Sequence, residues 1–144
     1  MYQSSQRGFT LIELVVVIVI LGILAAFALP KFMGLEGQAR ISTVKSMNGS
    51  IQSAANMAYG VWLASGGSGP GGTVSINGTA YAVAFGYPTA ASIPGLIQDT
   101  SGFTIAGNVW TKTGAATPAT CTLTYTPAAS ATVPPKVIPS LGGC

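Results

Sequence analysis

The sequence contains no histidine and few charged residues of either sign. Six Lys or Arg and three Asp or Glu make up 6% of its 144 residues, whereas ordinary soluble domains devote about a quarter of their residues to charge. With no histidine and so few acids, the chain offers no obvious set of side chains for acid–base catalysis or metal binding. Its net charge of +3 is also too small and too dispersed for a nucleic-acid surface.

The scarcity of charge also bears on association between copies. A lone soluble monomer with so few charges would be poorly protected from self-association. A subunit that is buried among copies of itself has no need of such protection. The composition therefore favours a protein that works in contact with its own copies.

What the sequence does contain is one long apolar run near its start. Leu11 to Leu29 spans 19 residues, and Glu13 is the one charged residue among them. As a helix this run would be about 29 Å long, close to the thickness of a bilayer's hydrocarbon core. Arg7 precedes the run, which predicts a cytoplasmic N-terminus by the positive-inside tendency. The run is therefore a candidate membrane span.

Two ordinary explanations of such a run remain open: a secretory signal peptide and a plain, uncleaved anchor. A signal peptide needs a small-residue cleavage site after its apolar core, and residues 28–33 (Ala-Leu-Pro-Lys-Phe-Met) make a poor one. The small residue Gly8 lies before the core instead. A cut after Gly8 would leave the apolar segment on the mature protein.

The residues around Gly8 carry a family resemblance. Residues 7–14 read Arg-Gly-Phe-Thr-Leu-Ile-Glu-Leu, and this string resembles the leader junction of type IV prepilins, with a short leader similar to the type IVa class. In that family a membrane peptidase cuts after the glycine and N-methylates the new terminal residue, which implies cleavage between Gly8 and Phe9 and methylation of Phe9. Residues 86–90 (Gly-Tyr-Pro-Thr-Ala) and the ending Gly-Gly-Cys are similar to pilins of the mannose-sensitive haemagglutinin type.

Glu13 has two interpretations, because a carboxylate in a membrane span is costly and needs a reason. It can be a first-turn acid that the helix dipole favours. The resemblance implies instead that Glu13 neutralises the Phe9 amine of a neighbouring subunit during assembly. Since an unpaired buried charge is expensive, such a pair would set the register between subunits as well as attract them.

The helix should continue beyond the apolar run. Pro30 removes a helical hydrogen bond, and Gly22, Gly34 and Gly37 weaken the same region. Helical periodicity nevertheless resumes in an apolar stripe with steps of three or four: Ile41, Val44, Met47, Ile51, Ala54, Ala58 and Val61. The pattern predicts one helix from Phe9 to about Leu63, weakened or bent at a helix break formed by Pro30, Gly34 and Gly37.

The residues after this helix predict strands. Asn77-Gly78 lies between two β-rich segments and is a strong signal for a two-residue hairpin turn. Further strands are expected within residues 103–112 and 120–126, which are rich in Thr, Val, Ile, Trp and Tyr. Three connecting segments are expected without regular structure: a flexible Gly-rich stretch at 65–72, a turn-rich stretch at 87–102, and an irregular proline-rich loop from Pro127 to Cys144.

Taken together, the patterns predict an α+β fold. A long N-terminal helix, with a membrane-spanning first half and an amphipathic second half, would pack on a small antiparallel β-sheet. Together with the resemblance, which implies the cleavage and the filament core, the expected parts are a cleaved leader (1–8), a transmembrane and filament-core helix (9–30), an amphipathic helix (31–63) and a globular β-sheet head (64–144).

The two cysteines, Cys121 and Cys144, both lie late in the chain. Two cysteines in a chain delivered outside the cytoplasm usually pair, and pilins close a surface loop between two late cysteines. A disulfide-closed C-terminal loop is therefore expected, with two free thiols as the alternative. Without histidine or clustered acids, two cysteines make a poor metal site.

The resemblance implies the major structural subunit of a type IV pilus. Such a subunit is stored in the inner membrane, processed by the prepilin peptidase, and extracted by an assembly platform and ATPase machinery. It then forms a homo-oligomeric helical filament, the extracellular pilus or fimbrium of a bacterium, which serves adhesion or motility. No cofactor, metal or nucleic-acid partner is expected.

Two alternatives come from other classes. A pseudopilin of a type II secretion system, or a minor pilin, would assemble in the same way, but major pseudopilins typically use late acidic residues for calcium. Here Asp99 is the one acid after Glu36. A membrane-anchored periplasmic enzyme is the other alternative, and the residue inventory of the head disfavours it.

Overall fold

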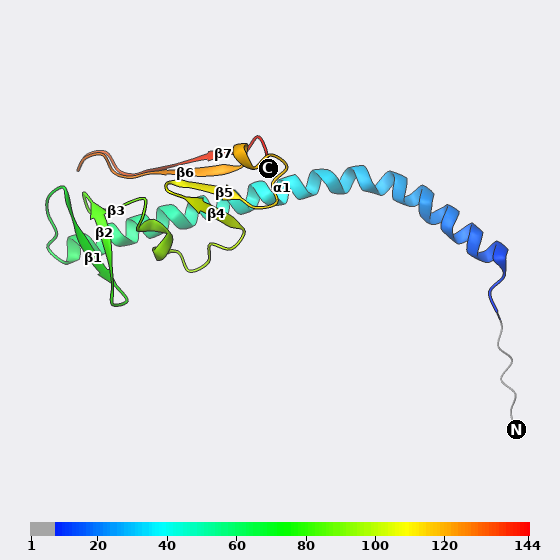
Figure 1. The fold of residues 1–144 in the computed structure, drawn as a ribbon, viewed down its shortest axis with the longest axis horizontal. Coiled ribbons are helices and arrows are strands. Elements are labelled where there is room, and N and C mark those ends of the chain that lie inside the picture. Colours follow the sequence, from blue (N-terminus) through cyan, green and yellow to red (C-terminus); the bar gives the residue numbers. More distant parts are fainter. Residues whose placement is uncertain (1–7) are drawn as a thin grey trace, which may run out of the picture. The chain divides into compact units, whose positions relative to one another are not determined.

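The computed structural model describes residues 8–144, and for residues 31–33 it describes the backbone only. The chain divides into two units, Met1–Glu36 and Gly37–Cys144. One helix, α1 (Leu11–Ala64), contributes to both units. Figure 1 shows that all strands follow α1 in the chain.

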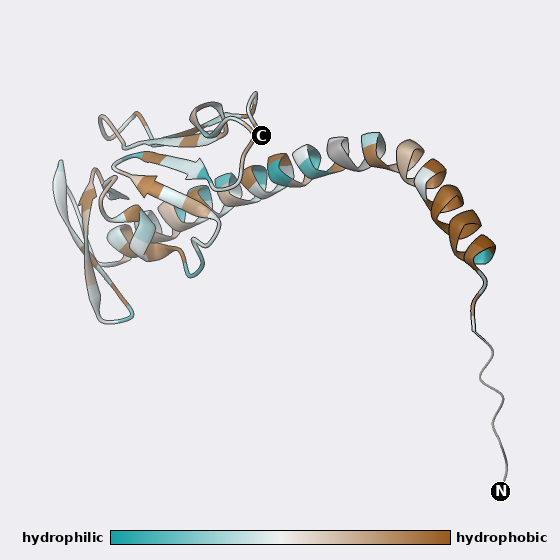
Figure 2. Ribbon diagram, turned by 45° about the vertical axis from the view of Figure 1, so that its right-hand side comes forward, coloured by the Kyte–Doolittle hydropathy of each residue, from teal (hydrophilic) through white to brown (hydrophobic). Residues whose placement is uncertain are grey.

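Helix α1 is 54 residues long, and its bounds lie within two residues of the predicted ones. Its N-terminal part is largely apolar, with Glu13 in the first turn as its one acid, and Figure 2 shows this part as mostly brown with a teal patch at its start. The backbone is helical across Pro30. The weakening expected at Pro30, Gly34 and Gly37 stays a prediction.

Three strands form the first sheet, in the order β1-β2-β3 and all antiparallel. They are β1 (Gly71–Ile76), β2 (Thr79–Ala84) and β3 (Tyr87–Pro88). The turn between β1 and β2 has Asn77 at φ 52° and Gly78 at φ 80°, so the predicted hairpin is confirmed. A second two-residue turn follows at Phe85 and Gly86, where Phe85 takes a φ of 53° that side chains rarely adopt.

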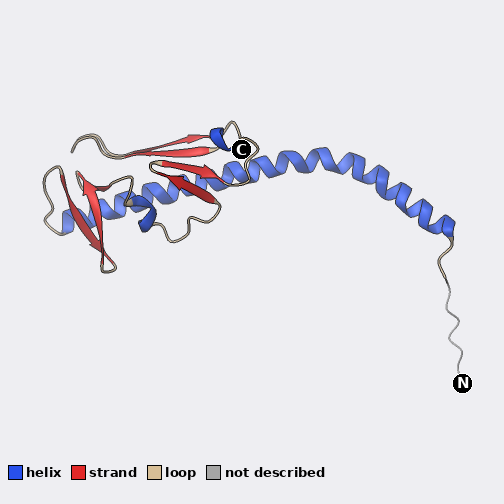
Figure 3. Ribbon diagram, in the orientation of Figure 1, coloured by secondary structure: helices blue, strands red, loops and turns tan. Residues whose placement is uncertain are grey.

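Four strands form the second sheet, also antiparallel, in the order β4-β5-β6-β7. They are β4 (Phe103–Ala106), β5 (Val109–Lys112), β6 (Thr122–Thr126) and β7 (Lys136–Ser140). Two short 3-10 helices, η1 (Ile93–Leu96) and η2 (Pro118–Thr120), lie in the connections. The α+β prediction is confirmed, with two small sheets where one was expected; Figure 3 shows the strands beside the C-terminal half of α1.

The prediction of an irregular loop from Pro127 to Cys144 is wrong for part of this tail. Residues of this tail form β7, which pairs with β6 in a five-residue register that sets Pro139 opposite Leu123. Because β7 is the last strand of its sheet, a proline without a backbone N–H is tolerated there. The prolines exclude this segment from the sheet interior, but not from its edge.

The core of the head is built on one face of α1. Five of the seven stripe residues are buried, and Ile41 and Val61 at its ends are half-buried. Ala55 and Trp62 are buried as well, beside the predicted stripe. This face packs in two clusters, one with residues of β5 and β6 such as Trp110 and Leu123, the other with Val74 and Val83 of the first hairpin.

The Gly-rich connection after α1 packs against Trp62 instead of serving only as a flexible link. A Cβ added at Gly72 would lie 2.6 Å from ring carbon Cζ3 of Trp62, and one at Gly67 would also overlap the indole. Both positions therefore need glycine for close approach. Strand β1 already begins at Gly71, inside the stretch that was expected to lack structure.

Candidate functional site

The apolar N-terminal segment of α1 leaves its side chains exposed. Every large apolar side chain from Phe9 to Leu29 is at least 38% exposed, and Phe9 reaches 86%. Each such side chain would gain about 1.5–3 kcal/mol from burial. By length and composition alone, α1 is also long and apolar enough to cross a membrane. The apolar surface of this segment is therefore left exposed in the single chain, and its burial would need another molecule or a membrane.

Thr10 and Glu13 form a reciprocal hydrogen-bonded pair at the start of α1. The backbone N–H and the hydroxyl of Thr10 both donate to Oε2 of Glu13, at 2.9 and 2.8 Å, and the backbone N–H of Glu13 donates to Oγ1 of Thr10 at 3.4 Å. This is a capping box, which satisfies backbone donors that the first turn of a helix leaves unpaired. The Thr-x-x-Glu spacing is a sequence signal for this box, and the role of Thr10 in it was not predicted.

The capping box leaves one carboxylate oxygen of Glu13 available. Both hydrogen bonds from Thr10 end on Oε2, and within the described part of the chain Oε1 accepts none. The first-turn interpretation of Glu13 is thus realised in the single chain, while a second acceptor stays open for another partner.

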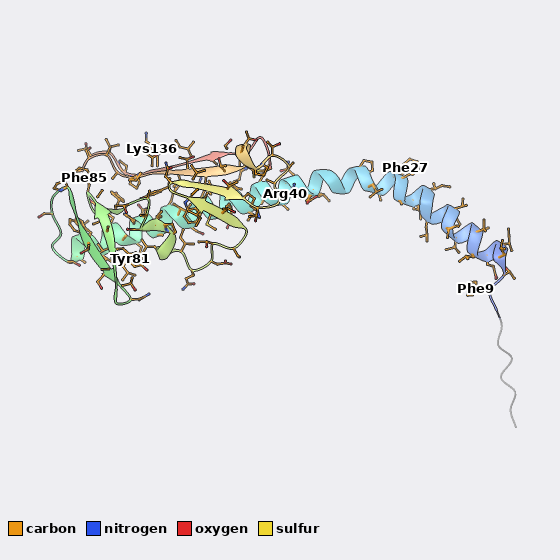
Figure 4. All side chains as sticks on the ribbon, in the orientation of Figure 1. Phe9, Phe27, Arg40, Tyr81, Phe85 and Lys136 are labelled. Atoms are coloured by element: carbon orange, nitrogen blue, oxygen red, sulfur yellow. A yellow bond between two sulfur atoms is a disulfide. The ribbon has the colours of Figure 1, made fainter. Side chains whose placement is uncertain are left out.

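Gly8 and Phe9 precede the helix and are exposed, and a Cβ at Gly8 would meet nothing within 4 Å. Figure 4 shows Phe9 at the beginning of the α1 ribbon. The predicted cut between Gly8 and Phe9 thus falls in non-helical, open backbone. Residues 1–7 of the predicted leader lie outside the described part of the chain.

Cys121 and Cys144 form a disulfide, with 4.9 Å between their Cα atoms, so the expected pairing is confirmed and the free-thiol alternative is wrong. The bond encloses β6 and β7, and the end of the chain is held further by Gly143. The N–H of Gly143 donates to the carbonyl of Thr120 at 3.1 Å, and its own carbonyl accepts from Thr117 at 2.9 Å.

The end of the enclosed segment also contacts α1. Nη1 of Arg40 donates to the carbonyl oxygen of Cys144 at 3.0 Å, and a Cβ at Gly37 would lie 3.9 Å from the same backbone. The backbone of Cys144, next to the disulfide, therefore contacts the part of α1 that begins the head unit. The boundary between the two units, after Glu36, lies in the segment where the helix break was predicted.

The buried Tyr125 and the half-buried Tyr87 and Tyr59 have structural partners in the head. The hydroxyl of Tyr125 on β6 donates to the carbonyl of Pro88 on β3 at 2.7 Å, which ties the two sheets together. Burial, with a smaller contribution from Tyr87, raises the pKa of Tyr125 to about 12. Tyr87 stacks on Tyr59 with ring centroids 4.4 Å apart, and burial raises its pKa as well.

The described residues contain no group of three or more His, Cys, Asp or Glu side chains placed to hold a metal ion. Asp99 accepts a hydrogen bond from the N–H of Ser101 at 2.8 Å, and hydrogen bonds from Ser101 lower the pKa of its carboxyl group.

Comparison with known proteins finds similarity in the N-terminal segment. Residues 3–29 match the prokaryotic N-terminal methylation motif. The chain is similar to the type IV major fimbrial protein FimA of Dichelobacter nodosus, at 44% identity over 52 residues that cover 36% of this chain and 33% of FimA. The type IV narrow pilus major component PilA5 of Thermus thermophilus is 50% identical over 48 residues, which cover 33% of this chain and 41% of PilA5.

A secretion protein is similar to a comparable degree. The type II secretion system core protein G of Pseudomonas aeruginosa is 46% identical over 57 residues, 40% of each chain. The chain thus spans between a third and two fifths of the length of these curated relatives. No solved structure matches it. The chain therefore carries the N-terminal segment shared by type IV pilins and their secretion-system relatives.

Proposed function

We propose that this chain is the major structural subunit of a type IV pilus. The first half of α1 holds it in the inner membrane, and the same segment then forms the core of the filament. The observation that supports this most directly is the exposed apolar segment that begins two residues after the Gly8–Phe9 junction. Lipid covers such a surface before assembly, and sister helices cover it afterwards.

Processing precedes assembly in this proposal. Prepilin peptidase cuts between Gly8 and Phe9 and methylates the amine of Phe9. The open backbone at Gly8 and the methylation motif over residues 3–29 support this step. The platform and ATPase machinery of the pilus then draw the subunit out of the inner membrane into an extracellular fimbrium, which serves adhesion or motility.

Glu13 has two successive tasks in this proposal. In the single subunit its Oε2 completes the capping box with Thr10. During assembly its Oε1 accepts a hydrogen bond from the methylated, protonated amine of Phe9 of a neighbouring subunit. Because both groups enter an apolar core, leaving either charge without its partner is strongly unfavourable.

A pseudopilin of type II secretion is the second candidate, and its support is the similarity to core protein G. The scarcity of acidic residues in the head argues against it, because Asp99 is the one acid after Glu36. A minor pilin is the third. Mass spectrometry of sheared surface filaments separates these functions, because a major pilin is the dominant protein of the filament and lacks residues 1–8.

A matched pair of variants separates the two tasks of Glu13. Glu13→Gln retains a side chain that capping boxes accept and removes the negative charge, so we expect insertion and processing but few filaments. Thr10→Ala removes the hydroxyl and keeps the charge, so we expect a milder loss of filaments. Normal piliation by Glu13→Gln would contradict the pairing role.

The junction itself is tested by Gly8→Arg. A bulky cation at this position blocks the cut, so full-length protein should remain in the inner membrane and surface filaments should be absent. Filaments of normal number and length from this variant would contradict the proposed function.

A further inference from the structure

The head carries a large open groove on one side of α1. It has a volume of about 900 Å³ and is lined by one side of α1 from Ser46 to Met57, the tip of the first hairpin, and the segment from Gly95 to Asp99. We call it the Asp99 groove. Met57, which is 47% exposed, and the half-buried Leu96 and Ile97 give it apolar lining, and Asp99 supplies its acid.

A smaller groove of about 440 Å³ lies against a different side of α1. Its lining includes Gln52, Asn56 and the segment from Pro134 to Ile138. We call the surface formed by this segment and Val133 the Lys136 ridge. Ile138 is 57% exposed and Val133 44% exposed, so the ridge offers apolar side chains beside one cation.

The two surfaces face different directions. Ser50 of the Asp99 groove and Gln52 of the smaller groove are about 200° apart around the helix, at roughly 100° per residue. Figure 4 agrees, since it shows Lys136 and Tyr81, a lining residue of the Asp99 groove, on opposite sides of α1. One copy therefore cannot bring its own Asp99 and Lys136 together.

The charge inventory of the head points to this pair. From Gly37 onward Asp99 is the one acid, and the cations are Arg40, Lys45, Lys112 and Lys136. Arg40 donates to the carbonyl of Cys144. Lys112 donates to the carbonyls of Gly102 and Thr113, and it lies over the Phe103 ring at 5.5 Å. In the described part of the chain, Lys45 and Lys136 have no such partner.

Lys136 fits Asp99 better than Lys45 does. Lys45 stands on an exposed helix face, with the small residues Ser42 and Gly49 one turn away. Lys136 stands among exposed apolar side chains, which match the apolar lining of the Asp99 groove. Contacts of this kind combine burial of apolar surface with one charge pair that sets register.

We propose that the Lys136 ridge of one subunit docks in the Asp99 groove of another copy, with an ion pair between the two charges. This inference rests on the proposed function, because a filament needs a heterologous contact made of two different surfaces on each subunit. This contact between the heads of two subunits then adds to the packing of the N-terminal helices and fixes the angle between successive heads.

Carbodiimide treatment of purified filaments tests the contact directly, since it joins a carboxylate to an amine only where the two touch. We expect covalent dimers and higher ladders on a denaturing gel, and a peptide that links Asp99 to Lys136. Filaments that give no such link, or that link Asp99 to Lys45, would overturn the proposal. Absence of this subunit from wild-type filaments would instead overturn the proposed function.

Charge exchange provides a second test, with Lys45 as the matched control. Asp99→Lys and Lys136→Asp should each lower filament yield roughly tenfold by placing like charges together. The double exchange should restore the yield, whereas Asp99→Lys combined with Lys45→Asp should not. Head folding is checked in each variant by the intact disulfide and by tryptophan fluorescence. Single variants that polymerise like wild type, or a double exchange that fails to restore the yield of a folded subunit, would overturn the contact.

Discussion

Removal of the disulfide should destabilise the head strongly without changing its fold. The perturbation is the double variant Cys121→Ala and Cys144→Ala. Alanine is preferred to serine because Cys121 is fully buried and a hydroxyl there would need a partner. Strand β7 and the two hydrogen bonds of Gly143 remain in place, so the tail keeps its native position in the folded state.

The expected loss follows from the unfolded state. The cysteines are 23 residues apart, and on the loop-entropy model a cross-link of that span stabilises by about 3.4 kcal/mol. For a domain near 100 residues this lowers the unfolding midpoint by about 10–20 °C. It also raises the unfolded fraction by roughly 300-fold, which should appear as faster proteolysis.

The assay is thermal unfolding of the full chain in detergent micelles. Trp62 and Trp110 are both buried in the head, so their fluorescence reports on this unit. Wild-type protein with reductant should unfold at nearly the same midpoint as the double variant. A difference below about 3 °C between the midpoints of the oxidised wild type and the double variant would refute the reasoning. The cross-link would then contribute almost nothing to the stability of the head.

Three further predictions concern the core and the helix. Gly72→Ala places a Cβ 2.6 Å from the Trp62 ring and should cost about 1–3 kcal/mol of unfolding free energy by overpacking, measured by chemical denaturation. Tyr125 ionises near pH 12 in the folded head and near 10 when unfolded, so stability should fall as pH rises from about 10 to 12. Tyr125→Phe should show a smaller fall over that range, because the phenol is gone. The helix around Pro30 should loosen in the assembled filament, since a packed protein core tolerates open backbone that lipid does not.

Each of these predictions has a control. Gly49 has open space around its Cβ position, so Gly49→Ala should leave stability equal or slightly higher; equal losses at Gly49 and Gly72 would contradict the contact with Trp62. Identical pH profiles for wild type and Tyr125→Phe would show that another group governs alkaline unfolding. A filament map with unbroken α-helix through Pro30 would refute the loosening.

Much of the fold followed from local patterns in the sequence. The spacing of Val44, Met47, Ile51 and Ala54 depends only on the helical period, so the buried face of α1 could be predicted. The Asn77–Gly78 turn is equally local, because its positive φ angles are a property of those residues. The N-terminal string and the Thr10–Glu13 box are also local, because their residues are close together in the chain. They form the candidate site.

Other features depended on residues that meet only after folding. Strand β7 contains Pro139, which local propensity excludes from a strand, and only its place at the sheet edge makes the strand possible. The need for glycine at Gly72 came from the Trp62 ring, ten residues earlier in the chain.

The sequence by itself determined the apolar helix, its cap and the disulfide partners, because each follows from local pattern or from the presence of only two cysteines. The tertiary structure decided which surfaces the head presents. The Asp99 groove joins residues from α1, the first hairpin and the segment before β4, and no spacing along the chain encodes that meeting. Long-range contacts depend on how whole elements pack against one another, so the grooves arise only when the head has folded.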